Sequence, residues 1–114
     1  NGREVETGEM FVGMFVGDHS KGGINVSFPT GAVIGFCSSV FTPRCPKFVP
    51  SFAWVDGDRV DRYDEVRGLA IARKVMARRK VEMSKAEEEA FMAVTRQALA
   101  IERQPQIGEV WPEY

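Results

Sequence analysis

One short segment of this chain gathers the residue types that proton transfer and substrate binding use. Within residues 17–25, His19 is the only histidine of the chain, and it directly follows Asp18. An imidazole titrates near neutral pH and is the side chain that most often moves a proton in enzymes. Lys21 and Asn25 lie within six residues of it. The segment therefore predicts a base or a substrate ligand at His19, beside polar side chains that can hold a substrate.

The same residues also have a purely structural interpretation. Asp and Asn side chains hydrogen-bond the backbone of turns, so Asp18 and Asn25 are equally typical of corners in the chain. His19 would then form a bond to a neighbouring segment. Its side chain would point away from that of Asp18, because adjacent residues of an extended chain point to opposite faces. The ammonium group of Lys21 is either a point charge for a phosphate or a solvated side chain. Both interpretations stay open on the sequence alone.

The elements that position this segment are indicated by a repeat of six residues. Short strands with one inward aliphatic residue each, separated by corner glycines, produce such a period. Three such strands close a coil of roughly eighteen residues, so Val16 is expected beneath Ile34. The repeat predicts about two coils of a left-handed parallel β-helix over residues 1–41. Its apolar phase is Met10, Val16, Phe28, Ile34 and Val40, with Gly22 as the exception, and Gly17, Gly23 and Gly35 recur in the next phase.

The period of six ends before residues 42–58, which are predicted to form a crossover. The prolines of this segment exclude a helix and a central strand. Its aromatic side chains are expected to pack across a surface of the β-helix, because a solvated loop would not retain them. The residues concerned are Pro43, Pro46, Pro50, Phe48, Phe52 and Trp54.

Residues 59–105 are predicted to form a helical hairpin, so the expected fold class is mainly β with carboxy-terminal α. Apolar residues at three- and four-residue spacing indicate a first helix over residues 60–79. A second helix begins after Ser84, because Ser84 and Glu87 form a capping box, and Pro105 ends it. The expected buried stripes are Tyr63, Val66, Leu69, Ala70, Met76 and Ala77, then Ala90, Phe91, Val94, Ala98 and Ile101.

A basic cluster late in the first helix has two possible roles. Cations at the carboxy-terminal end of a helix favour its dipole, and a concentrated basic patch can also bind an anionic partner. The tail, residues 106–114, either docks or stays loose. The cluster consists of Arg73, Lys74, Arg78, Arg79 and Lys80.

Charge and composition limit the function classes. The chain has 114 residues, enough for one compact domain, with 15 basic and 16 acidic side chains. This balance draws the protein neither to nucleic acid nor to an anionic membrane, so neither partner is expected. Cys37 and Cys45 give no metal-ligand spacing and no disulfide framework. A cytoplasmic protein whose sequence requires no metal is therefore expected.

The repeat is short for a stable solenoid. The chain opens on Asn1 and contains fewer than two complete coils. Stacked repeats bury their faces only against neighbours, and about three are usually needed for stability. We therefore expect upstream coils, self-association, or both.

Several motifs of this chain occur together in a known family. Residues 17–25 lie between Val5-Glu6-Thr7-Gly8 and Pro29-Thr30-Gly31, and residues 46–54 follow as Pro-Lys-Phe-Val-Pro-Ser-Phe-Ala-Trp. With these motifs, residues 5–92 resemble the carboxy-terminal end of bacterial sugar nucleotidyltransferase-like proteins. Those proteins look like the bifunctional N-acetylglucosamine-1-phosphate uridyltransferase/glucosamine-1-phosphate acetyltransferase.

The resemblance implies transfer of an acyl group from acetyl-CoA to an amino sugar, carried as a sugar phosphate or nucleotide sugar. It also implies a homo-trimer with acyl sites between subunits. His19 is not the catalytic histidine of that family, because the coils that hold that residue, and the nucleotidyltransferase domain, are absent from these 114 residues. In similar acetyltransferases the pantetheine arm of CoA runs along one edge of the coils. Asp18 and Phe36, eighteen residues apart, are candidates for that contact, with a core role as the alternative for Phe36.

Two hypotheses follow from these observations. In the first, the chain is the carboxy-terminal part of a sugar acyltransferase, incomplete for catalysis, with His19 as candidate base and Asp18, Lys21, Asn25 and Phe36 as candidate binding residues. In the second, it is a non-catalytic trimerisation or capping module. A metal centre with three histidines would have to lie on the symmetry axis of a trimer, because each chain supplies one histidine.

Overall fold

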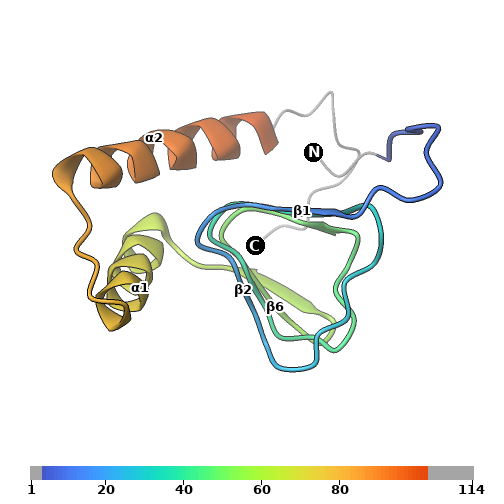
Figure 1. The fold of residues 1–114 in the computed structure, drawn as a ribbon, viewed down its shortest axis with the longest axis horizontal. Coiled ribbons are helices and arrows are strands. Elements are labelled where there is room, and N and C mark those ends of the chain that lie inside the picture. The colour runs from blue at the N-terminus through green and yellow to red at the C-terminus, as the bar shows by residue number, and fades with distance from the viewer. Residues whose placement is uncertain (1–3, 103–114) are drawn as a thin grey trace.

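Short, mostly parallel strands form the first half of the chain in the computed structural model, which describes residues 4–102. Two helices follow and lie on one side of the strands (Figure 1). Within the described residues, neither helix combines the length and apolar character that crossing a bilayer requires. The elements are β1 (Met14–Val16), β2 (Lys21–Gly22), β3 (Ala32–Ile34), β4 (Ser39–Val40), β5 (Phe48–Val49), β6 (Ala53–Asp56), β7 (Arg59–Arg62), α1 (Glu65–Arg78) and α2 (Lys85–Glu102).

The strands belong to two sheets, and the chain alternates between them. One sheet has the order β1-β3-β5 and is parallel, whereas the other has the order β2-β4-β6-β7 and ends in an antiparallel pair. Val16 pairs with Ile34, eighteen residues later, and Ile34 pairs in turn with Val49, fifteen residues later. Successive turns of the chain therefore stack on one another, with β1 and β2 at one end of the stack.

The expected fold class, a mainly β protein with a left-handed parallel β-helix over residues 1–41, is wrong. The described residues form a small α/β fold with one parallel sheet, one mixed sheet and two helices. The pairing of Val16 with Ile34 is confirmed, but the spacing then falls to fifteen residues and β7 runs antiparallel. Regular coils of a β-helix would have strands on a third side. At that place the described residues form a single β-bridge, between Ser27 and Arg44. One fixed repeat of six therefore does not describe the chain.

Residues 42–58 contain strands despite their prolines. β5 lies between Pro46 and Pro50, so neither proline removes a backbone donor from the strand itself. β6 then turns back into β7 through Gly57-Asp58, where Gly57 has a φ of 60°. Residues 59–62, expected at the start of the helical hairpin, are therefore a strand. The predicted burial of aromatic side chains holds for Phe52, which is inaccessible to solvent.

Both helices exist, and their starts follow ordinary capping chemistry. Asp64 is the N-cap of α1, and its carboxylate accepts a hydrogen bond from the Arg67 backbone N–H at 2.7 Å. The capping box before α2 is confirmed, because the Glu87 backbone N–H donates to Ser84 Oγ at 3.1 Å and the Ser84 N–H donates to the Glu87 carboxylate at 3.4 Å. Pro105 and the tail, residues 106–114, lie outside the described residues.

The buried faces of the helices differ from the expected stripes. Val66 of α1 is 75% exposed, whereas Gly68 and Ala72 are buried. A Cβ at position 68 would lie 2.7 Å from the Phe52 ring, so the absence of a side chain lets the helix approach this closely. In α2 the buried residues are Phe91 and Thr95. The helices thus face a second core, made of Phe36, Cys37, Phe52, Ala72 and Phe91, beside the one between the sheets, made of Ile34, Val40, Cys45, Val49, Ala53 and Val55.

We expect Gly35→Ala to lower the free energy of unfolding by about 3 kcal/mol, because overpacking forces backbone to move. A Cβ at position 35 would lie 2.4 Å from the Ser51 backbone nitrogen. Gly23→Ala is the matched control, since its Cβ would meet the movable Phe41 side chain at 3.1 Å. The control should lose less than about 1 kcal/mol. Urea unfolding measures both variants, and equal losses would contradict the close backbone approach at Gly35.

Candidate functional site

Three turns stack at one corner of the strands and carry most of the candidate residues. We call residues 17–20, 35–38 and 50–52 the stacked corner. His19, Cys37 and Phe52 occupy equivalent places in it, with φ angles of 60°, 56° and 59°. The Cys37 N–H donates to the Asp18 carbonyl at 2.9 Å, and the Phe52 N–H donates to the Phe36 carbonyl at 3.0 Å. Non-glycine residues rarely adopt this left-handed conformation, so the hydrogen bonds between layers must hold it in place.

His19 packs in an aromatic environment. Its ring centroid lies 5.9 Å from that of Phe36 in an edge-to-face arrangement, and 5.4 Å from that of Phe91 on α2. The imidazole forms no hydrogen bond with any described residue, and the Asp18 side chain beside it is exposed. A His–Asp dyad is therefore not formed in the described chain. The ring packs between the strands and α2, and it does not form the bond to a neighbouring segment that the structural interpretation predicted.

The other predicted site residues divide between the surface and the core. Lys21 follows the same turn, and its ammonium group donates to the His19 carbonyl oxygen at 3.1 Å. Asn25 is exposed at a separate corner with a φ of 59°, a conformation that asparagine tolerates. Phe36 is buried in the second core, against Phe52 and Phe91. Since burial removes Phe36 from any ligand edge, the predicted CoA contacts do not form a complete site here.

A buried contact that the sequence did not indicate joins the hairpin to the stacked corner. The Tyr63 hydroxyl donates a hydrogen bond to the Cys37 carbonyl oxygen. Burial raises the pKa of the Cys37 thiol, and burial together with Cys37 raises the pKa of the Tyr63 phenol. Both groups therefore stay neutral at physiological pH. The contact between Tyr63 and Cys37 anchors the hairpin to the stacked corner. It does not provide a nucleophile, because the thiolate is the reactive form of cysteine.

Glu102 makes a second contact that no pattern in the sequence indicates. Ser51 Oγ donates to the Glu102 carboxylate at 2.7 Å, and the Ser51 backbone N–H donates to both carboxylate oxygens at 3.2 Å. Ser51 Oγ also accepts from the Phe36 N–H at 2.9 Å. The end of α2 is thus fastened to the stacked corner across 51 residues of sequence. A separation of that length leaves no local signal.

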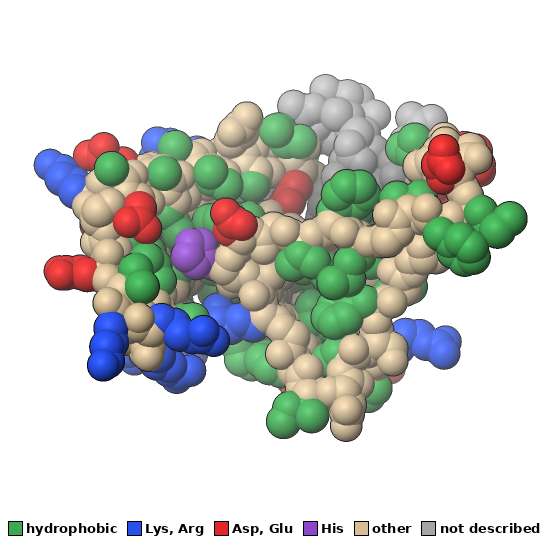
Figure 2. Space-filling model, in the orientation of Figure 1, with side chains coloured by type: hydrophobic (Ala, Val, Ile, Leu, Met, Phe, Trp, Pro, Cys, Tyr) green, Lys and Arg blue, Asp and Glu red, His purple; other side chains and the backbone are tan. Residues whose placement is uncertain are grey.

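One end of the stack is uncovered. We call it the open end and define it as Met14, Val16, β2 and Ile24. β1 and β2 are the edge strands of their sheets, so both edges end on the same side of the stack. Val16 is 50% exposed and Met14 47%, although their partners Ile34 and Ala32 are buried. Ile24 is 95% exposed. Hydrophobic side chains gather over the strands on this face in Figure 2. The open end has the composition of a core that lacks its next layer.

Comparison with known proteins adds no family and no related structure to the geometry described above. No protein family, curated protein or solved structure matches this chain. Within residues 4–102 no cluster of three or more His, Cys, Asp or Glu side chains is placed to hold a metal ion. The described arrangement contains an aromatic anchor at His19, a lysine beside it, two neutral buried groups at Cys37 and Tyr63, and the open end.

We expect iodoacetamide to alkylate Cys37 in the folded chain at pH 8 at least about tenfold more slowly than in urea, since burial raises its pKa and blocks access. Asp58→Cys supplies an exposed reference thiol in the β6–β7 turn. Mass spectrometry of peptic fragments quantifies both sites. Alkylation of Cys37 at the rate of the reference thiol would contradict the packed arrangement of Tyr63 over Cys37.

Proposed function

We propose that this chain is the closing module of a longer acyl-CoA-dependent sugar acyltransferase, and that it ends a stack of strands without carrying the transfer chemistry itself. The observation that supports this proposal is the difference between the two ends of the stack. One end presents apolar side chains and the strand edges of β1 and β2. The other is closed on the mixed sheet by the β6–β7 hairpin, whereas β5 is the edge of the parallel sheet there.

The open end favours further strands as its cover. Edge strands leave backbone N–H and C=O groups without partners in the sheet, and such edges readily accept another strand. Burying the exposed parts of Met14 and Val16 would add about 1 kcal/mol each at the usual gain per unit of apolar area. We infer that preceding strands of the longer polypeptide pair with β1 and β2 and present an apolar residue to Val16.

On the mixed sheet, the opposite end has features that oppose a further strand. β7 returns antiparallel beside β6, and three of its four residues are charged, namely Arg59, Asp61 and Arg62. Arg59 forms an ion pair with Asp61 at 2.8 Å, and Arg62 forms one with Glu65 of α1 at 2.9 Å. Charges on an edge strand oppose the addition of another strand. The module is therefore suited to closing a stack at this end and extending it at the other.

The chemistry of the proposal comes from the motif resemblance. Acetyl-CoA is the proposed donor, a sugar phosphate or nucleotide sugar the proposed acceptor, and the cytoplasm the proposed compartment. Of the predicted contacts, Lys21 and Asp18 remain at the surface of the stacked corner, whereas Phe36 is buried and His19 is packed against aromatic rings. We assign Lys21 to a phosphate of the ligand and His19 to positioning that turn. The base that accepts the proton would belong to other residues of the longer protein.

A purely structural module is the second candidate, and the open end favours it equally. In that case the chain closes and assembles a homo-trimer, and acyl-CoA has no site on it. The exposed apolar side chains would then serve contacts between chains or between segments alone. Binding of acetyl-CoA separates the two candidates.

We expect Lys21→Ala to weaken acetyl-CoA binding by the longer polypeptide about fivefold, the loss of one charge–phosphate contact of about 1 kcal/mol. Isothermal titration calorimetry measures the dissociation constant. Lys47→Ala is the control, because Lys47 lies on a different face and pairs with Glu4. Absence of any saturable heat in the longer polypeptide would reject acyl transfer and leave the structural module.

A second expectation concerns the cover of the open end. In the 114-residue chain, Val16→Lys should change the free energy of unfolding by less than about 0.5 kcal/mol, because Val16 is half exposed. In the longer polypeptide the same change should cost about 3 kcal/mol, because it buries an unpaired charge. Val66→Lys on α1 should have little effect in either context. Equal effects of Val16→Lys in both would contradict the proposed cover.

A further inference from the structure

The parallel sheet carries a second apolar face, which points away from the core. Phe15 pairs with Val33, and Val33 pairs with Phe48, so these three side chains form one ladder across β1, β3 and β5. Their neighbours Ile34 and Val49 point inward and are buried. Phe15 is 61% exposed and Val33 40%. Purely parallel sheets are normally covered on both faces, whereas Phe15 and Val33 of this ladder are only partly covered on the outer face by residues 4–102.

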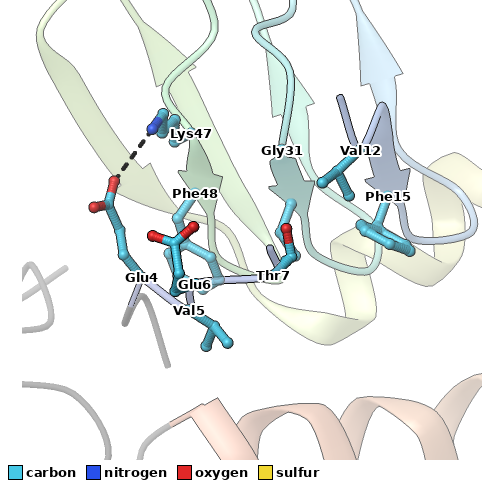
Figure 3. Close-up of a pocket in the computed structure, with 10 residues that line it drawn as sticks. Glu4, Val5, Glu6, Thr7, Val12, Phe15, Gly31, Lys47 and Phe48 are labelled. Atoms are coloured by element: carbon cyan, nitrogen blue, oxygen red, sulfur yellow. Dashed lines mark hydrogen bonds and ion pairs between the residues drawn. The ribbon is translucent and has the colours of Figure 1, made fainter. Parts of the chain in front are cut away.

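The amino-terminal segment covers this face only in part. Residues 4–7 pass beside the ladder and leave a groove of about 680 Å³, whose floor includes Phe15 and Phe48. Figure 3 shows Val5 and the carboxylates of Glu4 and Glu6 along one side of this groove, with Lys47 near its end. Lys47 pairs with Glu4 at 3.3 Å in an exposed position. The groove therefore has an apolar floor and a rim that carries both signs of charge.

We propose that the outer face of β1-β3-β5 is a self-association surface whose occupant is a second copy of this chain. The proposed contact joins two copies and is separate from the homo-trimer included in the proposed function, and it does not depend on acyl transfer. A surface that meets its own copy about a two-fold axis must complement itself, because each residue contacts a partner residue that contacts it in return. The rim meets this condition, since Glu6 of one copy can face Lys47 of the other.

Charge and composition also favour a second copy over other occupants. The formal net charge of the chain is −1, so two copies repel each other weakly. Phe15 is large, aromatic and mostly exposed, and such residues are enriched at the centres of protein contacts. Val5, 78% exposed, extends the apolar surface beyond the groove. A nucleic acid or an anionic membrane would instead need a basic floor, which this groove lacks.

Sedimentation equilibrium of the 114-residue chain tests the surface over about a hundredfold range of concentration. The unaltered chain should associate reversibly, and Phe15→Glu should weaken association at least about tenfold, because it places a charge at the centre of the contact. Val16→Lys is the matched control: it is the next residue of the same strand, yet it belongs to the open end. Circular dichroism checks that each variant keeps its fold.

Charge reversal gives an independent readout. Glu6→Lys and Lys47→Glu should each weaken association, and the double variant should recover at least half of the loss, because opposite charges again face each other. A monomeric chain at all concentrations would overturn the surface. Association that Val16→Lys abolishes and Phe15→Glu leaves intact would overturn the surface alone and move the contact to the open end. Neither result would alter the outcome with acetyl-CoA.

Discussion

Close approach of backbone to backbone at two glycines is the constraint on which the rest of this structure depends. A Cβ at Gly17 would lie 2.7 Å from the Phe36 nitrogen, and a Cβ at Gly35 would lie 2.4 Å from the Ser51 nitrogen. Only glycine permits layers of chain to meet at this distance. The same contacts bring three left-handed turns into line, so the N–H groups of Cys37 and Phe52 each find a carbonyl of the layer before. The strands that follow then start in register.

This corner also determines where the helices lie. Phe52 projects from its third layer and contacts Gly68 of α1, while the Phe36 and His19 rings contact Phe91 of α2. Hydrogen bonds hold the arrangement at two further points, from Tyr63 to the Cys37 carbonyl and from Ser51 to Glu102. Aromatic burial supplies most of the stabilisation here, and the polar contacts fix the orientation. His19, the one histidine of the chain, is part of this contact between the stacked corner and the helices.

The sequence predicted the elements that local chemistry controls. The capping box at Ser84 and Glu87 was visible because its two residues are three positions apart, and the pairing of Val16 with Ile34 followed from glycine spacing. The hairpin at Gly57-Asp58 was also visible in principle, since glycine at the first central position favours a two-residue turn, but the helical pattern that follows it was extended backward over β7.

Other features were beyond local reasoning. The change of spacing from eighteen to fifteen residues depends on how the third layer packs, which no repeat specifies. The buried stripe of α1 was misjudged because Val66 is more hydrophobic than Gly68, whereas the neighbouring Phe52 ring leaves room only for the smaller residue. At the candidate site, the placement of His19 among aromatic rings depended on Phe91, more than seventy residues away.

The left-handed turns also bear on which amino acids each layer accepts. Positions 19, 37 and 52 hold histidine, cysteine and phenylalanine in a conformation that costs an ordinary residue about 1 to 2 kcal/mol. Glycine would relieve this strain at each position but would remove a side chain that packs between the stacked corner and the helices. Valine, isoleucine and threonine are excluded there for steric reasons. Substitutions at position 19 are therefore governed first by backbone shape, and a histidine at this point of the chain is not by itself a sign of proton transfer.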